Sequence, residues 1–247
     1  MSQPGPAPEI TFVVPVYEEP DNIGPTLESL REHVAAPHDV LVVYDFEEDT
    51  TVPVVRDLQP RMPEVALLRN DLGRGVLNAM KAGIAAATAP FVVVTMADGS
   101  DDYRDIGPMV AAARTGADVV AASRYMAGGG QIGGPRIKRL MSRAAGLSMY
   151  YIGGVATHDA TNNFKLYRRS FLESVTIESE GGFELALELT VKATLGGRSV
   201  AEVPTTWRDR TAGESNFRMR AWLPRYLRWY LALFAGRLKA RRLRRAA

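Results

Sequence analysis

The chain has 247 residues, 46% of them hydrophobic, a length that suits one large α/β domain or two small ones. It has no cysteine, which excludes disulfides and thiolate metal sites, and its three histidines are too few and too scattered for a histidine metal site. The net charge is only +2, but residues 218–247 carry ten of the 30 Arg and Lys residues and no acid. The remaining 20 basic residues face 28 acidic ones, so an acidic body precedes a basic tail that favours an anionic surface.

The N-terminal segment, MSQPGPAPEI, is polar and proline-rich and lacks the basic and apolar regions of a signal peptide. We therefore expect residues 1–8 to be a disordered leader and the protein to be cytoplasmic. Further along, short apolar runs alternate with segments of helical periodicity, which predicts βαβ units around a mostly parallel sheet. Strands are expected at Ile10–Val16, Val40–Tyr44, Val65–Arg69, Phe91–Met96, Asp118–Ala122, Phe164–Tyr167 and Ser199–Val203. Helices are expected at Asp21–Val34, Val52–Leu58, Arg74–Thr88, Asp102–Thr115, Arg136–Gly153 and Gly182–Leu195.

Two stretches of the second half are expected to be loops: the glycine-rich Met126–Pro135, either a mobile lid or a plain connector, and the charged Trp207–Phe217. The C-terminal Met219–Ala240 places leucines and aromatic residues at helical spacing between arginines. Its longest charge-free apolar run, Trp229–Ala235, is far shorter than the about 20 residues that span a bilayer. This pattern favours a helix lying in a membrane interface. A terminal helix packed on the domain, or a partner-binding helix, remains an alternative.

One stretch, FVVVTMADGSDDY at residues 91–103, ends an apolar run at an acidic turn that contains Asp98, Asp101 and Asp102. Ligands of open α/β sheets lie beyond the carboxyl ends of the strands. Carboxylates gathered there repel one another, and a hard cation such as Mg²⁺ or Mn²⁺ prefers such oxygen ligands, often shared with a substrate phosphate. The alternative is a solvated turn that caps the next helix, since Ser and Asp favour helix starts.

Several blocks occur together in one order: VVPVYEE (13–19), VVYDFEEDT (42–50), GRGVLNAMKAG (73–83), MADGSDD (96–102), SRYMAGGG (123–130), DATNNFKLYRR (159–169) and EVPTTWRDRTAGES (202–215). In these blocks the chain resembles family 2 glycosyltransferases, and among them the polyprenyl-phosphate (dolichol-phosphate) mannose synthases. The resemblance implies a GT-A domain over residues 9–217, with a Rossmann-like, mostly parallel sheet flanked by helices, followed by a basic amphipathic tail at 218–247. It implies inverting transfer of a hexose, with mannose favoured, from a nucleotide-sugar to a polyprenyl or dolichyl phosphate. The reaction would take place at the cytosolic membrane face, with the protein peripheral to the membrane.

The resemblance also assigns a donor site. Tyr17 offers a stacking face, Glu19 an acceptor, and the backbone around Gly73 and Arg74 a site for phosphate or ribose at a helix start. Asp98 matches the last Asp of the family's DxD motif, whereas Met96 stands at the position of the first. The implied metal ion, Mg²⁺ or Mn²⁺, would be bound by Asp98 with Ser100 or Asp101. The full set expected to contact the nucleotide-sugar is Pro15, Tyr17, Glu19, Asp45, Gly73, Arg74, Asp98, Asp159 and Asn162.

Two arginines match phosphate-binding positions of the synthases. Arg124 and Arg210 are therefore expected to bind the acceptor phosphate and, with Asp98, to form the catalytic set, because a guanidinium grips phosphate oxygens in a bidentate way. A surface ion pair is the alternative role for Arg124. Relatives commonly have DDGS where this chain has Tyr44 to Glu47, so the donor is left as either GDP-mannose or a UDP-hexose.

The acceptor is inferred from a missing residue. Sugar-acceptor members use a Glu-Asp pair as general base, but here Glu184 is followed by Leu185. A lipid phosphate needs no base, because its second pKa of about 6 leaves it mostly ionised at neutral pH. Two alternatives stay open: a family member with a UDP-sugar donor and another lipid or saccharide acceptor, and a degenerate, non-catalytic nucleotide-binding domain, which Met96 favours. Nucleic acid is not expected as a partner, since the body is acidic and carries no recognised motif. The oligomeric state is not predicted.

Overall fold

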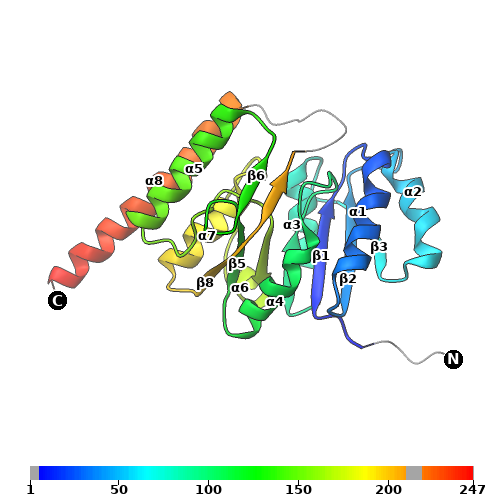
Figure 1. Ribbon diagram of the computed structural model, residues 1–247, viewed down its shortest axis with the longest axis horizontal. Helices are drawn as coiled ribbons and strands as arrows, with labels where there is room; N and C mark the ends of the chain where they lie inside the picture. The colour runs from blue at the N-terminus through cyan, green and yellow to red at the C-terminus, as the bar shows by residue number, and fades with distance from the viewer. Residues whose placement is uncertain (1–5, 210–218, 247) are drawn as a thin grey trace.

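The computed structural model describes residues 6–209 and 219–246, which form a central sheet with helices on both faces (Figure 1). The sheet contains β1 (Ile10–Pro15), β2 (His38–Tyr44), β3 (Val65–Arg69), β4 (Phe91–Val94), β5 (Val119–Ser123), β7 (Lys165–Arg168) and β8 (Val200–Pro204). A separate pair is formed by β6 (Gly130–Ile132) and β9 (Thr206–Arg208). The helices are α1 (Pro20–His33), α2 (Thr51–Leu58), η1 (Gln59–Arg61), α3 (Val76–Ala86), η2 (Tyr103–Asp105), α4 (Ile106–Arg114), α5 (Arg136–Tyr151), α6 (Arg169–Glu173), α7 (Leu185–Leu195) and α8 (Met219–Ala246).

The strand order of the large sheet is β3-β2-β1-β4-β7-β5-β8. Its strand pairs are parallel except those of β7, which runs antiparallel to both β4 and β5. Lys165, the first residue of β7, pairs with Val94 at the end of β4 and with Ala121 in β5. The segment that leads into β7 therefore lies at the edge where the parallel strands end. The expected mostly parallel sheet is confirmed.

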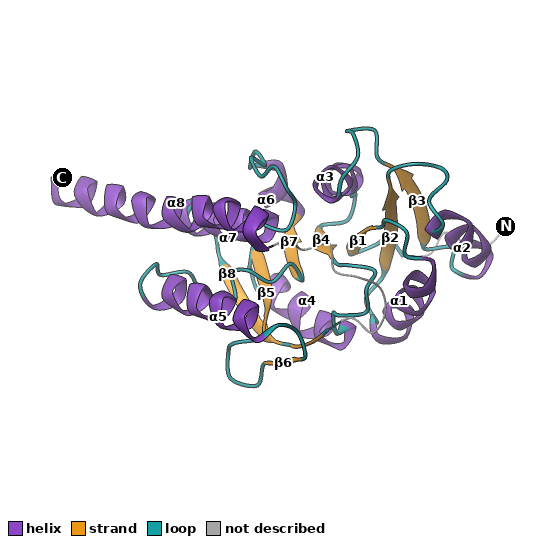
Figure 2. Ribbon diagram, turned by 90° about the horizontal axis from the view of Figure 1, so that it is seen from above, coloured by secondary structure: helices purple, strands orange, loops and turns teal. Residues whose placement is uncertain are grey.

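The core consists of two layers, one on each face of the sheet (Figure 2). Successive strand residues point to opposite faces, so Phe12 and Val14 join the layer under α1, α2 and α4, whereas Val13 joins the layer under α3, α6 and α7. Burial on both faces explains why these strands read as continuous apolar runs rather than as alternating patterns.

The C-terminal helix α8 packs on the domain through one of its faces. Trp229 and Leu233 are buried against Met149 of α5 and Leu187 and Val191 of α7. The leucines on its outer face are about half exposed: Leu223, Leu227, Leu231 and Leu238. In the described part of the chain, no helix is both long and apolar enough to cross a bilayer.

The expected elements differ from the structure mainly at their ends. β4 stops at Val94, two residues earlier than expected. The Thr95 amide still donates to the Val13 carbonyl, and its hydroxyl contacts Asp101 and Tyr103. Helix α7 begins at Leu185 rather than at Gly182. The β6–β9 pair lies in stretches expected to be loops, since strands of three residues with glycine carry little pattern.

Candidate active site

Loops from different parts of the sequence meet at the carboxyl edge of the sheet. Tyr17, Asp45, Asp98 and Arg124 follow β1, β2, β4 and β5, whose parallel strands all end at this edge. Asp159 lies in the segment that returns to the same edge before β7. Four strand ends and one reversed strand thus bring the predicted site residues to one side of the molecule, where ligands of open α/β sheets bind.

The turn that follows β4 brings two acidic side chains close enough to influence each other. Oδ2 of Asp101 accepts a hydrogen bond from Thr95 Oγ1 at 2.8 Å, and Oδ1 of Asp98 accepts one from the Ser100 amide at 3.1 Å. Burial and the neighbouring charge of Asp98 raise the pKa of Asp101 to about 7. The two carboxylates therefore repel each other, and a cation between them would relieve that repulsion.

The donor atoms of this turn suit a hard divalent ion that takes further ligands from a substrate. Across residues 6–209 and 219–246, no three His, Cys, Asp or Glu side chains are grouped to hold a metal. Two carboxylates are enough for Mg²⁺ when diphosphate oxygens and water complete its shell. Asp98 and Asp101 fit that role, and coordination by Ser100, which is buried here, stays a prediction.

Two aromatic rings at the ends of β1 and β2 meet edge to face, and an arginine from the loop before α3 lies over one of them. The Tyr17 ring lies 5.9 Å from the Phe46 ring, and the Arg74 guanidinium carbon lies 4.7 Å from the Phe46 centroid. Tyr17 is 58% exposed, so an aromatic surface faces solvent at the edge where a base would bind. The sequence analysis assigned roles to Tyr17 and Arg74 but none to Phe46. The position of Phe46, directly after Asp45 and the end of β2, could have indicated that it lies at the site.

The Asp45 carboxylate is held within the protein. Its Oδ1 accepts from Asn70 Nδ2 and its Oδ2 from the Gly75 amide, both at 2.7 Å. Gly75 has a φ of 128°, which L side chains rarely adopt, so a glycine is needed for this amide to meet the carboxylate. Asp45 thereby fixes the loop around Gly73 ahead of α3. A contact between Asp45 and the base or ribose stays a prediction.

The loop after β1 is fixed by a buried carboxylate that the sequence reading missed. The Glu18 amide donates to both oxygens of Asp49 at 3.3 Å, and the Glu19 amide donates to Thr51 Oγ1 at 2.9 Å. Glu18 has a φ of 53° that these bonds maintain. Asp49 also accepts from the Thr51 amide, the Asx turn that an Asp-Thr-Thr sequence favours. The roles of Pro15 and Glu19 toward a nucleotide stay predictions.

Arg124 and Asp159, both expected to contact substrate, are bound to each other. Arg124 donates through Nε to Oδ2 of Asp159 at 2.6 Å and through Nη2 to Oδ1 at 2.9 Å, and its amide donates to Oδ2 at 3.1 Å. The Arg124 side chain is 12% exposed and that of Asp159 is fully buried, so this is an interior ion pair. Burial acts to raise the pKa of Asp159, but the charge and hydrogen bonds of Arg124 together with the Lys165 charge lower that pKa overall.

Two hydroxyl groups extend this pair toward α5. Nη2 of Arg124 also donates to Ser142 Oγ and Thr161 Oγ1, both at 3.3 Å, and these hydroxyls lie 2.6 Å apart. One turn after Ser142, a Cβ on Gly146 would lie 2.2 Å from the His158 carbonyl, so only glycine lets α5 approach this closely. Arg124, Ser142 and Thr161 thus form a group of polar side chains suited to a phosphate, which we call the hydroxyl–arginine group.

The turn before β7 is organised by polar groups in the interior. Lys165 Nζ donates to the carbonyl oxygens of Asp159 at 3.4 Å, of Ala160 at 3.2 Å and of Asn162. The Asn162 side-chain amide donates to the Ala122 carbonyl at 2.8 Å and is buried. Sugar contact by Asn162 stays a prediction. The sequence reading passed over Lys165, a lysine inside an otherwise apolar strand.

The carboxylates that match the general-base region of sugar-acceptor enzymes serve the backbone. Glu184 accepts from the amides of Gly181 and Gly182 at 2.8 and 3.0 Å. Glu188 accepts from the amides of Glu178 and Ser179 at 2.7 and 2.8 Å and pairs with Lys192. Both are buried. They fix the loop of residues 178–182, and neither is presented as a base.

Two further segments border the site. The Tyr226 hydroxyl of α8 donates to the Phe183 carbonyl at 2.7 Å, which ties the C-terminal helix to the loop before α7. The Arg208 amide of β9 donates to the Ser100 carbonyl at 3.2 Å, so the β6–β9 pair lies against the carboxylate turn. Arg210, two residues further on, lies outside the described residues, and its role stays a prediction.

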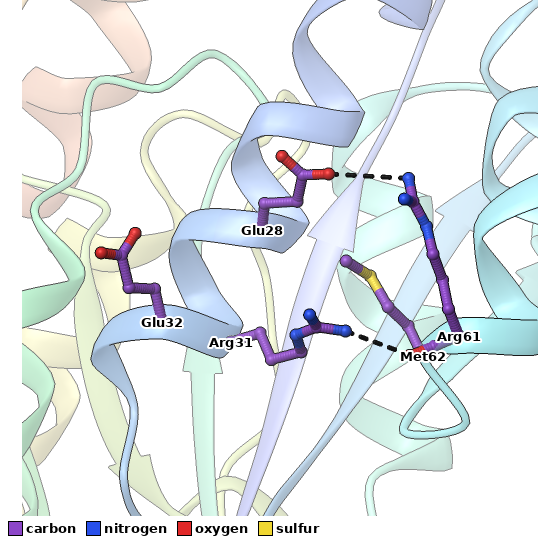
Figure 3. A pocket seen from close by; sticks show the side chains of 5 residues that line it. All are labelled: Glu28, Arg31, Glu32, Arg61 and Met62. Carbon is purple, nitrogen blue, oxygen red and sulfur yellow. Dashed lines mark hydrogen bonds and ion pairs between the residues drawn. The ribbon is translucent and has the colours of Figure 1, made fainter.

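A cavity of about 400 Å³ lies elsewhere, between α1 and η1 (Figure 3). It contains an ion pair of 3.6 Å between Glu28 and Arg61 and a hydrogen bond of 3.1 Å from Arg31 to the Arg61 carbonyl. It shares no residue with the site described above. Its lining residues are Glu28, Arg31, Glu32, Arg61 and Met62.

Comparison with known proteins places the chain in a family. The model of glycosyl transferase family 2 matches residues 11–176. The chain belongs to glycosyl transferase family 2. This membership confirms the expected class of enzyme and the α/β fold.

Two curated members of the family resemble the chain over most of its length. The polyprenol monophosphomannose synthase of Mycolicibacterium smegmatis is 30% identical over 223 residues, which cover 85% of this chain and 81% of that protein. The undecaprenyl-phosphate mannosyltransferase of Micrococcus luteus is 31% identical over 213 residues, with coverage of 83% and 86%. The resemblance to polyprenyl-phosphate mannose synthases is thereby confirmed.

A solved structure supports the fold. The mannosyltransferase PcManGT from Pyrobaculum calidifontis, in complex with GDP-Man and Mn²⁺, aligns with a TM-score of 0.65 at 19% identity. The alignment covers 95% of this chain and 65% of that one. At this identity the likeness concerns the fold alone.

Proposed function

We propose that this chain is an inverting transferase that moves a mannosyl group from a nucleotide-sugar to a polyprenyl phosphate at a membrane surface. The single observation that carries the proposal is the hydroxyl–arginine group at the carboxyl edge of the sheet, in a chain whose curated relatives are named as polyprenol-phosphate mannosyltransferases. Glu184 and Glu188 accept hydrogen bonds from backbone amides and so are not presented as general bases. This supports an acceptor that is already ionised and needs no base.

The donor would lie across the ends of β1, β2 and β4. Its base would stack on the group of Tyr17, Phe46 and Arg74, and its diphosphate would face Asp98 and the turn after β4. A divalent metal ion bound by Asp98 and Asp101 would neutralise charge on the departing diphosphate. Mn²⁺ accompanies GDP-Man in the Pyrobaculum calidifontis structure, which supports such an ion here.

The acceptor phosphate would bind at the hydroxyl–arginine group. Asp159 accepts from the Nε and Nη2 edge of the Arg124 guanidinium, and Nη2 also bonds to both hydroxyls, so a phosphate would meet the hydroxyls and the other edge of the guanidinium. A phosphate oxygen attacks the anomeric carbon from the face opposite the diphosphate. The bond from that carbon to the diphosphate oxygen breaks, and its electron pair leaves with the nucleoside diphosphate, so the configuration inverts. No proton moves, and the rate gain comes from positioning and charge stabilisation.

Helices α5 and α8, at the β8 end of the sheet (Figures 1 and 2), supply a surface for the membrane. Ile137 and Leu140 on α5 are 69% and 70% exposed, and Leu227 and Leu231 on α8 are also exposed. Basic residues accompany both apolar faces, which suits helices lying on an anionic bilayer. We propose a peripheral position on the cytosolic face, where the lipid phosphate reaches α5.

The test is product formation with defined substrates. Purified chain, Mg²⁺ or Mn²⁺, and polyprenyl phosphate in anionic vesicles are combined with GDP-mannose or with UDP-glucose, and the lipid product is identified by mass. We expect a mannosyl polyprenyl phosphate, lost in Asp98→Ala without a change in melting temperature. Asp102→Ala is the matched control, because Asp102 lies in the same turn but pairs with exposed Arg104. Near-normal turnover of Asp98→Ala, or transfer to a soluble sugar alone, would refute the proposal.

A UDP-hexose donor is the second candidate. Asp45 is bound by Asn70 and the Gly75 amide, which leaves stacking as the main interaction at the base site, and stacking does not select guanine over uracil. Transfer from UDP-glucose but not from GDP-mannose in the same assay identifies this alternative.

A further inference from the structure

Lys165 is a cation in the interior of the protein that the reaction scheme above does not use. It is fully buried at the start of β7, between β4 and β5. Its ammonium donates to carbonyl oxygens of Asp159, Ala160 and Asn162. Burial lowers its pKa to about 7; the Asp159 charge opposes that shift and the Arg124 charge adds to it. Burying an apolar side chain at this position would cost less free energy than burying a lysine.

The charges around Asp159 do not balance among themselves. Arg124 and Lys165 are both positive when protonated, and the Asp159 carboxylate between them supplies one negative charge. These are the charged groups that act on Lys165 in the described residues, from the end of β5 and from the loop before β7. The Arg124 charge also acts on Asp101, whose pKa is about 7, so the excess positive charge is present while Asp101 is protonated and Lys165 is charged. In that state the cluster favours an anion at its open side. That side is the hydroxyl–arginine group, since Arg124 retains some exposure.

We propose that Lys165 is a positioning residue for the acceptor phosphate. It fixes the backbone of residues 159–162, which sets the Asp159 carboxylate and, through it, the guanidinium of Arg124. It also supplies the positive charge that an incoming phosphate neutralises. The inference rests on the proposed function, because it assigns the hydroxyl–arginine group to an anionic acceptor.

The first test measures the effect of one substitution on acceptor binding and on nucleotide binding separately. Lys165→Met keeps the length of the side chain and removes its charge. We expect the KM for polyprenyl phosphate to rise about 10- to 100-fold, as for loss of hydrogen bonds to a charged group. The Kd for GDP should change less than about twofold, because the nucleotide site lies on β1, β2 and β4. Thr11→Val is the matched control, since it removes another buried polar group, one that accepts from the Ala89 amide. It should alter stability but not the acceptor KM.

The second test needs no variant and covers the case in which Lys165→Met does not fold. Between pH 7 and 9 a lipid phosphate stays dianionic, because its second pKa is about 6. Asp101, whose pKa is about 7, ionises over this interval, but it lies in the turn proposed for the donor, so its effect is read in the KM for the nucleotide-sugar. Arg124 stays protonated and Asp159 ionised, and Lys165, whose pKa is also about 7, loses its proton. The wild-type KM for the acceptor should therefore rise over this interval, whereas the KM for the nucleotide-sugar should not follow it.

An acceptor KM that is unchanged in Lys165→Met, or flat from pH 7 to 9 in the wild type, overturns the inference while leaving the proposed function intact. Equal losses of GDP and acceptor affinity in Lys165→Met indicate a general structural role and also overturn it. Wild-type protein that neither binds nor mannosylates a polyprenyl phosphate refutes the proposed function itself. Selective loss of acceptor affinity together with the pH effect supports the inference.

Discussion

The interior ion pair of Arg124 and Asp159 predicts unequal costs for removing its two members. Asp159→Asn leaves the Arg124 guanidinium buried without its carboxylate partner, the situation in which breaking a buried pair costs about 3–5 kcal/mol, and Lys165, which loses the Asp159 charge that supports its protonation, becomes neutral at pH 7. Arg124→Gln leaves Asp159 with Lys165 as a remaining positive neighbour. We expect that change to cost about 1–3 kcal/mol of unfolding free energy.

Urea unfolding at pH 7, followed by far-UV circular dichroism, measures both costs, and the double variant measures their coupling. The double variant should lose less than the sum of the single losses, because neither member of the pair is then left buried without its partner. Glu173→Gln is the surface control: its pair with Arg169 is exposed, so we expect a change below about 0.5 kcal/mol. Equal costs for the two single variants, or strictly additive costs, would refute the reasoning about charge balance.

Three further predictions concern the group of Tyr17, Phe46 and Arg74, the carboxylate of Glu188, and the buried Lys165. Phe46→Ala removes the ring between Tyr17 and Arg74, and should weaken GDP and UDP binding in calorimetry about tenfold, the low end of base–aromatic stacking; unchanged affinity would exclude a base there. Glu188→Gln should cost about 1–3 kcal/mol in urea unfolding while the pH–rate profile keeps its shape; a lost basic limb would instead identify Glu188 as a base. Because the folded pKa of Lys165, about 7, lies below its ordinary 10.5, the unfolded chain binds more protons between these values. Unfolding free energy should therefore rise from pH 7 to 9, by about 2–3 kcal/mol relative to Lys165→Met; parallel pH curves for the two proteins would contradict this.

The sequence predicted the central strands because each is buried on both faces and so appears as an uninterrupted apolar run. Ile10–Pro15 and Phe91–Val94 are such runs, and their ends correctly located the edge where Tyr17 and Asp98 lie. The direction of β7 was not predictable from its four residues, because parallel and antiparallel strands of that length have the same pattern.

The candidate site was predicted by residue type but not by partner. Asp45, Arg124 and Asp159 lie at the carboxyl edge as expected, yet the partners that hold Asp45 and the Arg124–Asp159 pair come from 25 to 35 positions away in the chain. Contacts at that separation leave no local signature. Asp49 was missed for the same reason, since it accepts from the Glu18 amide 31 positions away. Lys165 was missed although its carbonyl partners lie only three to six positions away, because its role depends on the turn of residues 159–162 folding back onto its ammonium.

The antiparallel strand β7 lies between two parallel parts of the sheet, β3-β2-β1-β4 and β5-β8, for which different roles are proposed. The sites proposed for the base and diphosphate come from β1 to the turn after β4, whereas the hydroxyl–arginine group and the lipid-facing helices come from β5 onward. Strand β7 joins the two halves by backbone pairing, and one core layer with Val93 and Val120 continues across both, so an exchange of halves has to keep that layer matched. Chimeras joined in the segment between β4 and β5 should then exchange lipid preference between relatives while each keeps the sugar chosen by its N-terminal half.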